Sequence, residues 1–221
     1  MKSEASEMRV VIFDLGGVVV KVCRGWNEAA ERVGVPRADE SRFALPDLQS
    51  SRRELSDAYQ RGQIESHEYF ERIADATDGL YTPEQVERVH RAWVMEAYDG
   101  IAELIDALNA LDGIETACLS NTNAAHWDDL KRGAGDGWGA ISRLGHPFVS
   151  HEVGMVKPHA EIYEAVRAQL GRDASSLIFF DDLEENVRAA RDAGWHAFQI
   201  DHTGDTARQA RAALRPLGFD L

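Results

Sequence analysis

The hydrophobic and polar positions divide the chain into an initial strand, a long helical block and a region of alternating elements. Residues 10–13 are β-branched or aromatic and predict a buried strand, which ends at Asp14 and is followed by two glycines that permit a tight turn. Between residues 21 and 94 the apolar spacing is helical, with no strand-like run. From residue 99 onward, helical and strand-like patterns alternate.

The helical block is predicted to hold four short helices. They are expected over residues 26–33 and 54–60, from residue 66 and from residue 83. Thr82, Pro83 and Gln85 supply a hydroxyl cap, a proline at the first helical position and a glutamine that completes a capping box. Ser66 can cap the third helix. These signals favour a small helical bundle.

The alternating region predicts a sheet. Strands are expected over residues 114–119, 148–150, 177–180 and 195–200, helices over 101–111, 158–170 and 182–194, and a loop over 133–145. Strand–helix alternation is typical of a parallel sheet with helices on both faces. We therefore expect an α/β fold with a small all-helical cap inserted after the first strand.

The expected domains are a catalytic core of residues 1–20 and 95–221 and a helical cap domain of residues 21–94. Open α/β sheets bind ligands at the carboxyl ends of their strands. Because the insertion directly follows the carboxyl end of the first strand, it is well placed to act as a lid over Asp14.

The amino-acid composition limits the kinds of partner that the protein is expected to bind. Among the 221 residues, Lys and Arg total 24 against 38 Asp and Glu, for a formal net charge of -14. This balance argues against a nucleic-acid surface or an anionic membrane. Cys23 and Cys118 lie far apart in apolar contexts, as expected of buried thiols in a reducing compartment. No apolar segment approaches the roughly eighteen residues that span a bilayer, so the sequence predicts a cytoplasmic protein.

Polar residues follow three of the predicted strands. In a parallel sheet, Asp14, Ser120 and the pair Asp181-Asp182 all lie at one edge. Three crowded carboxylates repel one another unless a cation lies between them, and an all-oxygen ligand set suits magnesium rather than zinc. We therefore expect Mg²⁺, bound by Asp14, Asp182 and the carbonyl of Gly16.

Simpler interpretations remain open at this point. Asp14 can be a turn aspartate, and Asp182 can cap the helix that follows it. The stretch 120–123 can be a helix cap or a cluster of neutral donors for a phosphate. Lys157 can be a surface lysine or the cation that an anionic nucleophile needs beside an anionic phosphate. The eight histidines show no metal-ligand spacing and are expected to be structural or exposed.

Four motifs, in order along nearly the whole chain, resemble those of the haloacid dehalogenase superfamily. They are Phe13-Asp14-Leu15-Gly16-Gly17-Val18, Leu119-Ser120-Asn121, Lys157-Pro158, and Phe180-Asp181-Asp182 with Asn186. The chain is most similar to the branch that includes bacterial glucose-1-phosphate phosphatases and that resembles the N-terminal phosphatase domain of soluble epoxide hydrolases. The resemblance implies a Rossmann-like core with a helical cap.

The resemblance also implies roles for the motif residues. Asp14 would attack phosphorus and form an aspartyl-phosphate that water later cleaves. Ser120 and Asn121 would bind the transferring phosphoryl group, together with the Gly16-Gly17 turn. Lys157 would offset the charge between this group and Asp14.

On the metal side, the resemblance makes Asp182 the second protein carboxylate on magnesium. Asp181 would orient the waters of the metal, and so belongs to the same metal site as Asp14 and Gly16.

Gly16 departs from the superfamily pattern. Most of its phosphatases carry a second aspartate at this position, which protonates the leaving group and then activates water. General acid–base help is worth roughly a hundred- to ten-thousandfold in rate. A leaving group less basic than an ordinary alkoxide, such as the anomeric oxygen of a sugar 1-phosphate, lessens this need. An acid from the cap, for instance His67 or Asp47, is an alternative.

The function expected is that of a magnesium-dependent phosphomonoesterase acting on a small phosphorylated metabolite. One alternative is a metal-independent 2-haloacid dehalogenase, which uses the same aspartate against carbon and also lacks the second aspartate. The other is a non-catalytic protein that binds a metabolite or a partner. Arg24, Trp26 and the turn 61–63 are the cap positions expected to face the site.

Overall fold

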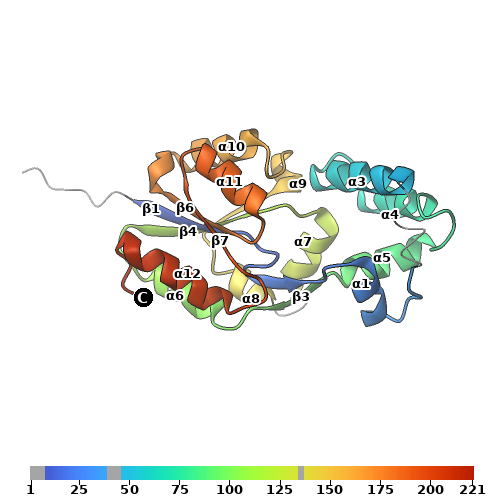
Figure 1. Ribbon diagram of the computed structural model, residues 1–221, viewed down its shortest axis with the longest axis horizontal. Helices are drawn as coiled ribbons and strands as arrows, with labels where there is room; N and C mark the ends of the chain where they lie inside the picture. Colours follow the sequence, from blue (N-terminus) through green and yellow to red (C-terminus); the bar gives the residue numbers. More distant parts are fainter. Residues whose placement is uncertain (1–7, 39–45, 134–136) are drawn as a thin grey trace, which may run out of the picture.

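The core of the computed structural model is a five-stranded parallel sheet (Figure 1). The structure describes residues 8–38, 46–133 and 137–221. The strands are β1 (Arg9–Phe13), β4 (Ile114–Ser120), β5 (His146–Val149), β6 (Leu177–Asp181) and β7 (His196–Gln199). Their order is β5-β4-β1-β6-β7, and all neighbouring pairs are parallel. The predicted α/β class is therefore confirmed.

The register of the sheet brings the polar strand ends together. Phe13 of β1 pairs with Cys118 of β4 and with Phe180 of β6. The residues that follow these three positions therefore leave the sheet at the same carboxyl edge. The backbone N–H of Asp14 donates to the Phe180 carbonyl at 2.8 Å, which holds Asp14 at this edge beside Asp181.

Helices cover both faces of the sheet (Figure 1). They are α10 (Ala160–Leu170) and α11 (Glu184–Asp192) on one face, and α6 (Ile101–Asn109) and α12 (Thr206–Leu214) on the other. Val10 and Ile12 pack toward α10 and α11, whereas Val11 and Phe13 pack toward α6 and α12. Since both faces are covered, β1 is apolar from Val10 to Phe13 rather than alternating.

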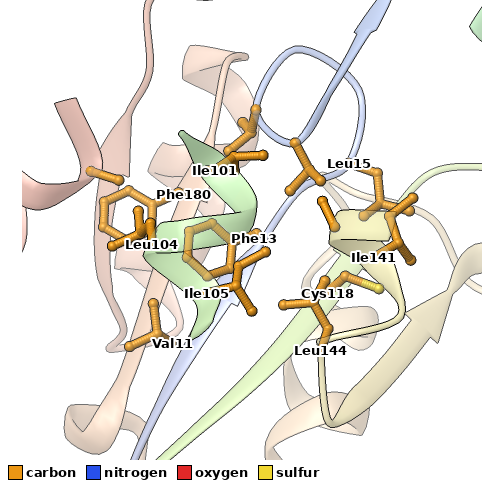
Figure 2. Close-up of a cluster of buried hydrophobic side chains, with 14 of the residues drawn as sticks. Val11, Phe13, Leu15, Ile101, Leu104, Ile105, Cys118, Ile141, Leu144 and Phe180 are labelled. Atoms are coloured by element: carbon orange, nitrogen blue, oxygen red, sulfur yellow. The ribbon is translucent and has the colours of Figure 1, made fainter. Parts of the chain in front are cut away.

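Figure 2 shows the apolar cluster on the α6 side of β1. The rings of Phe13 and Phe180 stack with centroids 5.5 Å apart, and Leu104 and Ile105 of α6 lie beside them. All four side chains are fully buried, and each contributes roughly 1.5–3 kcal/mol through burial. This packing fixes the end of β1 and, with it, the backbone of Asp14.

The helical block lies at one end of the sheet (Figure 1). Its helices are α1 (Trp26–Arg32), α3 (Pro46–Gln60), α4 (Ser66–Asp75) and α5 (Pro83–Arg91). In the sequence, two short strands flank these helices, β2 (Val20–Val22) before them and β3 (Val94–Ala97) after them, and the two strands pair antiparallel. The sequence predicted no strand here, because three or four residues are too few to show a period of two. The exact division into a core and a cap at residues 21 and 94 stays a prediction.

Several local predictions can be compared with the structure. The capping box of α5 is confirmed, since Thr82 and Gln85 exchange side-chain to backbone hydrogen bonds in both directions. The cap predicted for α4 is wrong: Ser66 is its first helical residue, and its hydroxyl bonds the Tyr59 hydroxyl at 2.6 Å. Helix α3 begins at Pro46 rather than near residue 54.

Two more predictions fail near the sheet. The segment predicted as a loop over 133–145 contains α8 (Gly137–Ile141). The strand predicted over 148–150 is shifted, because Ser150 begins the short helix α9 (Ser150–Val153). The remaining elements are α7 (Ala124–Lys131) and the 3-10 turns η2 (Ala174–Ser176) and η3 (Arg215–Leu217). Among the described residues, no helix combines the length and the apolar character needed to cross a membrane.

Candidate active site

A cavity of about 560 Å³ lies where the carboxyl edge of the sheet meets the helical block. The predicted site residues that line it are Asp14, Gly16, Ser120, Asn121, Lys157 and Asp182. Gly17 and Asp181 lie behind this lining. From the helical side, the wall includes Arg24, Trp26, Arg52, Tyr59, Tyr69 and His90. Residues from four separate segments of the core therefore share one cavity with the insertion.

Lys157 joins two of the carboxylates. Its Nζ lies 3.0 Å from Asp14 Oδ1 and 2.6 Å from Asp181 Oδ2, and its side chain is only 1% exposed. Asp14 Oδ1 also accepts a hydrogen bond from the Leu15 N–H at 2.7 Å. A surface position for Lys157 is thus wrong. One buried cation between two carboxylates leaves an excess of negative charge at this point of the site.

Burial and neighbouring charges shift the pKa values of Asp14 and Lys157. Burial raises the pKa of the Asp14 carboxyl to about 7, with a further rise from Asp181, while Lys157 and a hydrogen bond from Ser120 act in the opposite direction. Burial lowers the pKa of Lys157, but the charges of Asp14 and Asp181 outweigh it and leave this pKa above the ordinary value. Lys157 therefore stays charged, and Asp14 needs positive charge nearby in order to ionise fully.

Asp181 fixes the position of Lys157. It is fully buried, and its two oxygens accept from Lys157 Nζ, from the Leu183 N–H at 2.8 Å and from Asn186 Nδ2 at 3.0 Å. With these partners, the carboxylate is held in one orientation. This arrangement makes Asp181 a positioning residue.

Asp182 lies closer to the cavity. Its Oδ2 is 2.8 Å from Arg24 Nη1, and its carbonyl accepts from Gln199 Nε2 at 3.1 Å. Helix α11 begins after it with Leu183 as N-cap, so Asp182 is not a helix cap. Gly17 has a φ of 83°, and a Cβ there would lie 2.5 Å from Asp182 Oδ2. The positive φ favours glycine at position 17, and a larger residue would also displace the Asp182 carboxylate. The contact of Gly17 with phosphate stays a prediction.

The Asn121 side chain holds the loop that carries Lys157. Its Nδ2 donates to the Lys157 carbonyl and its Oδ1 accepts from the Lys157 N–H, each at 2.8 Å. The amide nitrogen carries two N–H donors and uses one of them here, so the second stays available in the cavity that Asn121 lines. The contact of Asn121 with a phosphoryl group stays a prediction.

The helix cap predicted within the stretch 120–123 is confirmed for Asn123, whereas phosphate binding by this stretch stays a prediction. Asn123 caps α7, since its Oδ1 accepts from the His126 N–H at 3.1 Å. Ser120 instead lines the cavity and hydrogen-bonds Asp14. Ser150 fastens the loop between them, because its Oγ accepts from the Thr122 N–H and donates to the Thr122 carbonyl.

The three aspartates fit a hard cation. One oxygen from each of Asp14, Asp181 and Asp182 can be chosen so that all lie within 4.8 Å of one another, and all three residues are buried. Only oxygen ligands are present in this cluster, as magnesium prefers. Asp181 is already saturated by protein donors, which leaves Asp14 and Asp182 as the carboxylates available to bind it.

Neither of the acids considered from the cap is placed at the site. His67 is exposed on α4 and is not among the cavity-lining residues. The side chain of Asp47 lies outside the described residues. Gly16 lines the cavity, and a Cβ there would lie 3.3 Å from Val22 Cγ1 of β2. Arg24 and Trp26 line the cavity as expected, but the turn 61–63 does not.

Sequence reasoning missed two histidines of the cavity, His90 on α5 and His126 on α7. Neither has metal-ligand spacing, and they meet only through the contact of the insertion with the core. His126 stands three residues after Asn123, which is the spacing of a cap with its first turn. This spacing is a local signal in the sequence that places His126 in the first turn of a helix. We find no comparable local signal for His90.

Comparison with known proteins identifies the family. Residues 8–194 match the family model described as haloacid dehalogenase-like hydrolase. The chain therefore belongs to this family of hydrolases, as its motifs predicted. The particular branch suggested by the sequence stays a prediction.

Individual relatives include phosphatases. The chain is 22% identical over 207 residues to D-ribitol-5-phosphate phosphatase of Bacteroides thetaiotaomicron, covering 92% of this chain and 97% of that protein. It is 36% identical over 72 residues to phosphatase MT3486 of Mycobacterium tuberculosis, a match that spans only 33% of either chain. A crystal structure of a HAD family enzyme from Bacteroides thetaiotaomicron, in complex with magnesium and inorganic phosphate, has a TM-score of 0.68 at 22% identity and covers 90% of this chain and 96% of that chain. This last likeness shows the fold.

Proposed function

We propose that the protein is a magnesium-dependent phosphomonoesterase that hydrolyses a small phosphorylated metabolite through an aspartyl-phosphate on Asp14. The observation that carries this proposal is the buried Asp14–Lys157–Asp181 arrangement with Asp182 beside it, at the floor of one cavity. A carboxylate nucleophile, a fixed cation and a set of oxygen ligands are the parts that phosphoryl transfer needs. The phosphatase relatives support the reaction class.

In the proposed reaction, an oxygen of Asp14 forms a bond to phosphorus while the bond from phosphorus to the ester oxygen breaks. The ester oxygen leaves as an alcohol after taking up a proton. Water then attacks the phosphoryl group on Asp14, which releases inorganic phosphate and restores the carboxylate. Lys157 stays 3.0 Å from Asp14 and lowers the repulsion between this carboxylate and the phosphate.

Magnesium, held by Asp14, Asp182 and the carbonyl of Gly16, would supply the positive charge that neutralises the phosphoryl oxygens. Among the described residues, Lys157 and Arg24 form ion pairs with the three carboxylates of this cluster. Burial raises the pKa of Asp14, and the charge of Asp181 raises it further, so added positive charge would favour its ionised form.

The glycine at position 16 bears on the kind of leaving group that we propose. No carboxyl group stands at the position of the usual acid, so an ester whose oxygen leaves readily is favoured. We therefore propose a sugar phosphate, and in particular a sugar 1-phosphate, as substrate. Hydrolysis of sugar 6-phosphates as fast as sugar 1-phosphates by the purified protein would contradict this part of the proposal.

The experiment is a panel of phosphate esters assayed with magnesium on the wild type and on Asp14→Asn. We expect turnover in the wild type, its loss with chelator, and at least a thousandfold loss in Asp14→Asn, an order of magnitude typical of a removed nucleophile. Equal rates in the two proteins would remove Asp14 from the mechanism. No turnover, together with thermal stabilisation by a ligand, would indicate a binding protein.

A 2-haloacid dehalogenase remains the second candidate because Gly16 is compatible with it. That reaction needs no metal, so the buried oxygen cluster of three aspartates favours the phosphatase. Release of halide from 2-chloropropionate with chelator present would reverse this preference.

A further inference from the structure

Two histidines stack where the helical insertion meets the core. The rings of His90 and His126 lie 4.1 Å apart between centroids, with an interplanar angle of 10°. Tyr69 and Phe70 of α4 each present an edge contact to His90 at 5.3 Å. Both histidines line the cavity, and His90, on α5, belongs to the part of the wall that the insertion contributes.

The hydrogen bonds assign the proton on each ring. Asn123 Oδ1 accepts from the His126 N–H, so this oxygen is an acceptor and His90 Nε2, 3.2 Å from it, donates. His126 Nε2 lies 2.7 Å from the His90 carbonyl, which only accepts, so this nitrogen also carries a proton. Asn123 Nδ2 then donates to His126 Nδ1 at 3.2 Å. His126 is saturated.

His90 keeps one free nitrogen. Within the described parts of the chain, His90 Nδ1 has no hydrogen-bond partner, and it is not among the fully buried atoms that lack one. Since the ring lines the cavity, Nδ1 is open to it. Burial lowers the pKa of His90 well below its ordinary value, and the charge on His126 adds to this, so the ring stays neutral. Nδ1 is therefore a hydrogen-bond acceptor.

We propose that His90 Nδ1 accepts a hydrogen bond from a substrate hydroxyl away from the phosphoryl group, and so selects phosphate esters of polyhydroxylated carbon chains. The inference rests on the proposed phosphatase function and adds the side chain that would recognise the hydroxylated part of the substrate. A second phosphate or a carboxylate at this point would place acceptor against acceptor. An alkyl chain would strip Nδ1 of water without giving it a donor. A hydroxyl supplies the donor that this position lacks.

The test is a binding measurement that does not depend on turnover. Calorimetry with magnesium on the wild-type protein would compare the phosphonate analogue of a hexose 1-phosphate with cyclohexylmethyl phosphonate, which has a ring of the same size without hydroxyls. Neither C–P bond can be cleaved by the proposed reaction, so Asp14 is kept as a metal ligand. His90→Gln keeps a polar group near the Nε2 position but none at Nδ1, whereas His90→Asn keeps one near Nδ1. We expect His90→Gln to lower the ratio of the two affinities about tenfold, as for one lost hydrogen bond, and His90→Asn to retain most of this ratio.

His67→Gln, on the exposed face of α4, is the matched control and should leave the ratio as in the parent. Unfolding curves for each variant would show that the ratio is measured on folded protein. If both ligands bind and His90→Gln leaves the ratio unchanged, His90 has only a structural role and the inference is wrong. If neither phosphonate binds the wild-type protein with magnesium, the phosphatase proposal fails as well.

Discussion

The adjacent glycines at positions 16 and 17 contribute to the site in different ways. Gly16 lines the cavity at the position where the superfamily usually carries its acid, so in the proposed mechanism it would limit which leaving groups depart without an acid. Gly17 does not line the cavity, but its missing side chain leaves the space that Asp182 Oδ2 occupies. Gly16 therefore concerns the protonation of the leaving group, whereas Gly17 concerns the position of Asp182, a proposed metal ligand.

Gly17→Ala is expected to weaken magnesium binding. Its Cβ would lie 2.5 Å from Asp182 Oδ2, so Asp182 must move. We expect the magnesium concentration for half-maximal activity to rise about ten- to hundredfold, as when a metal ligand loses its support. Gly34→Ala is the control, since Gly34 also has a positive φ but no atom within 4 Å of a Cβ. An equal magnesium requirement in the two variants would contradict the role of Gly17.

Residues at strand ends were predictable, whereas residues defined by a tertiary partner were not. Asp14 and the pair at 181–182 each follow an apolar run, and parallel strands bring such ends together. The roles of Asn121 and His90 depend on contacts with residues more than thirty positions away, Lys157 and Asn123 respectively. No local pattern encodes such a contact.

At the scale of elements, the turn between α3 and α4 touches the core at α9. Gly62 in this turn has a φ of 66°, and a Cβ there would lie 2.3 Å from the His151 carbonyl oxygen. The contact is between two backbones and cannot be relieved by a rotamer change. It therefore sets how closely the insertion approaches the core.

Gly62→Ala is expected to separate α3 and α4 from α9. Overpacking of this kind costs about 1–3 kcal/mol of unfolding free energy, and the displaced wall of the cavity should raise KM more than it lowers kcat. Gly79→Ala, at a φ of 73° with no atom within 4 Å of a Cβ, is the matched control. Urea unfolding and steady-state kinetics on both variants would decide the matter. If the two variants had the same unfolding free energy and the same KM, the contact at Gly62 would not determine how the insertion packs on the core.

Elements with a clear period or cap were predicted, and the short ones were not. The sheet strands and α5 had buried runs or a capping box, which are local signals. Strands β2 and β3 and helix α8 are each five residues or shorter and depend on their neighbours for stability. The helical insertion was therefore predicted without the pair of strands at its base.

Over the whole molecule, partly buried histidines make stability depend on pH. Burial lowers the pKa values of His90, His126 and His151 below the ordinary 6.5. At these residues the unfolded chain therefore binds protons below about pH 6.5 that the folded chain does not. The stability that they contribute is fully present above this pH and is lost as the pH falls toward the lowered values.

Between pH 7 and pH 5.5 each such histidine lowers the unfolding free energy by up to about 1.4 kcal/mol per pH unit, whereas Asp14, with its pKa raised to about 7, acts in the opposite direction. His126→Gln keeps a donor near the His90 carbonyl but removes one titrating histidine, so its unfolding free energy should fall less than that of the wild type over this range. His67→Gln should follow the wild type. Parallel curves for the wild type and His126→Gln would contradict this account.

The central claim is that Asp14 carries the phosphoryl group during turnover, and rapid quench with a labelled phosphate ester tests it most directly. The account predicts that label appears in the peptide that contains Asp14 before free phosphate accumulates at its steady rate, and that Asp14→Asn abolishes this labelling. Label on another residue, or steady release of phosphate by Asp14→Asn, would contradict it.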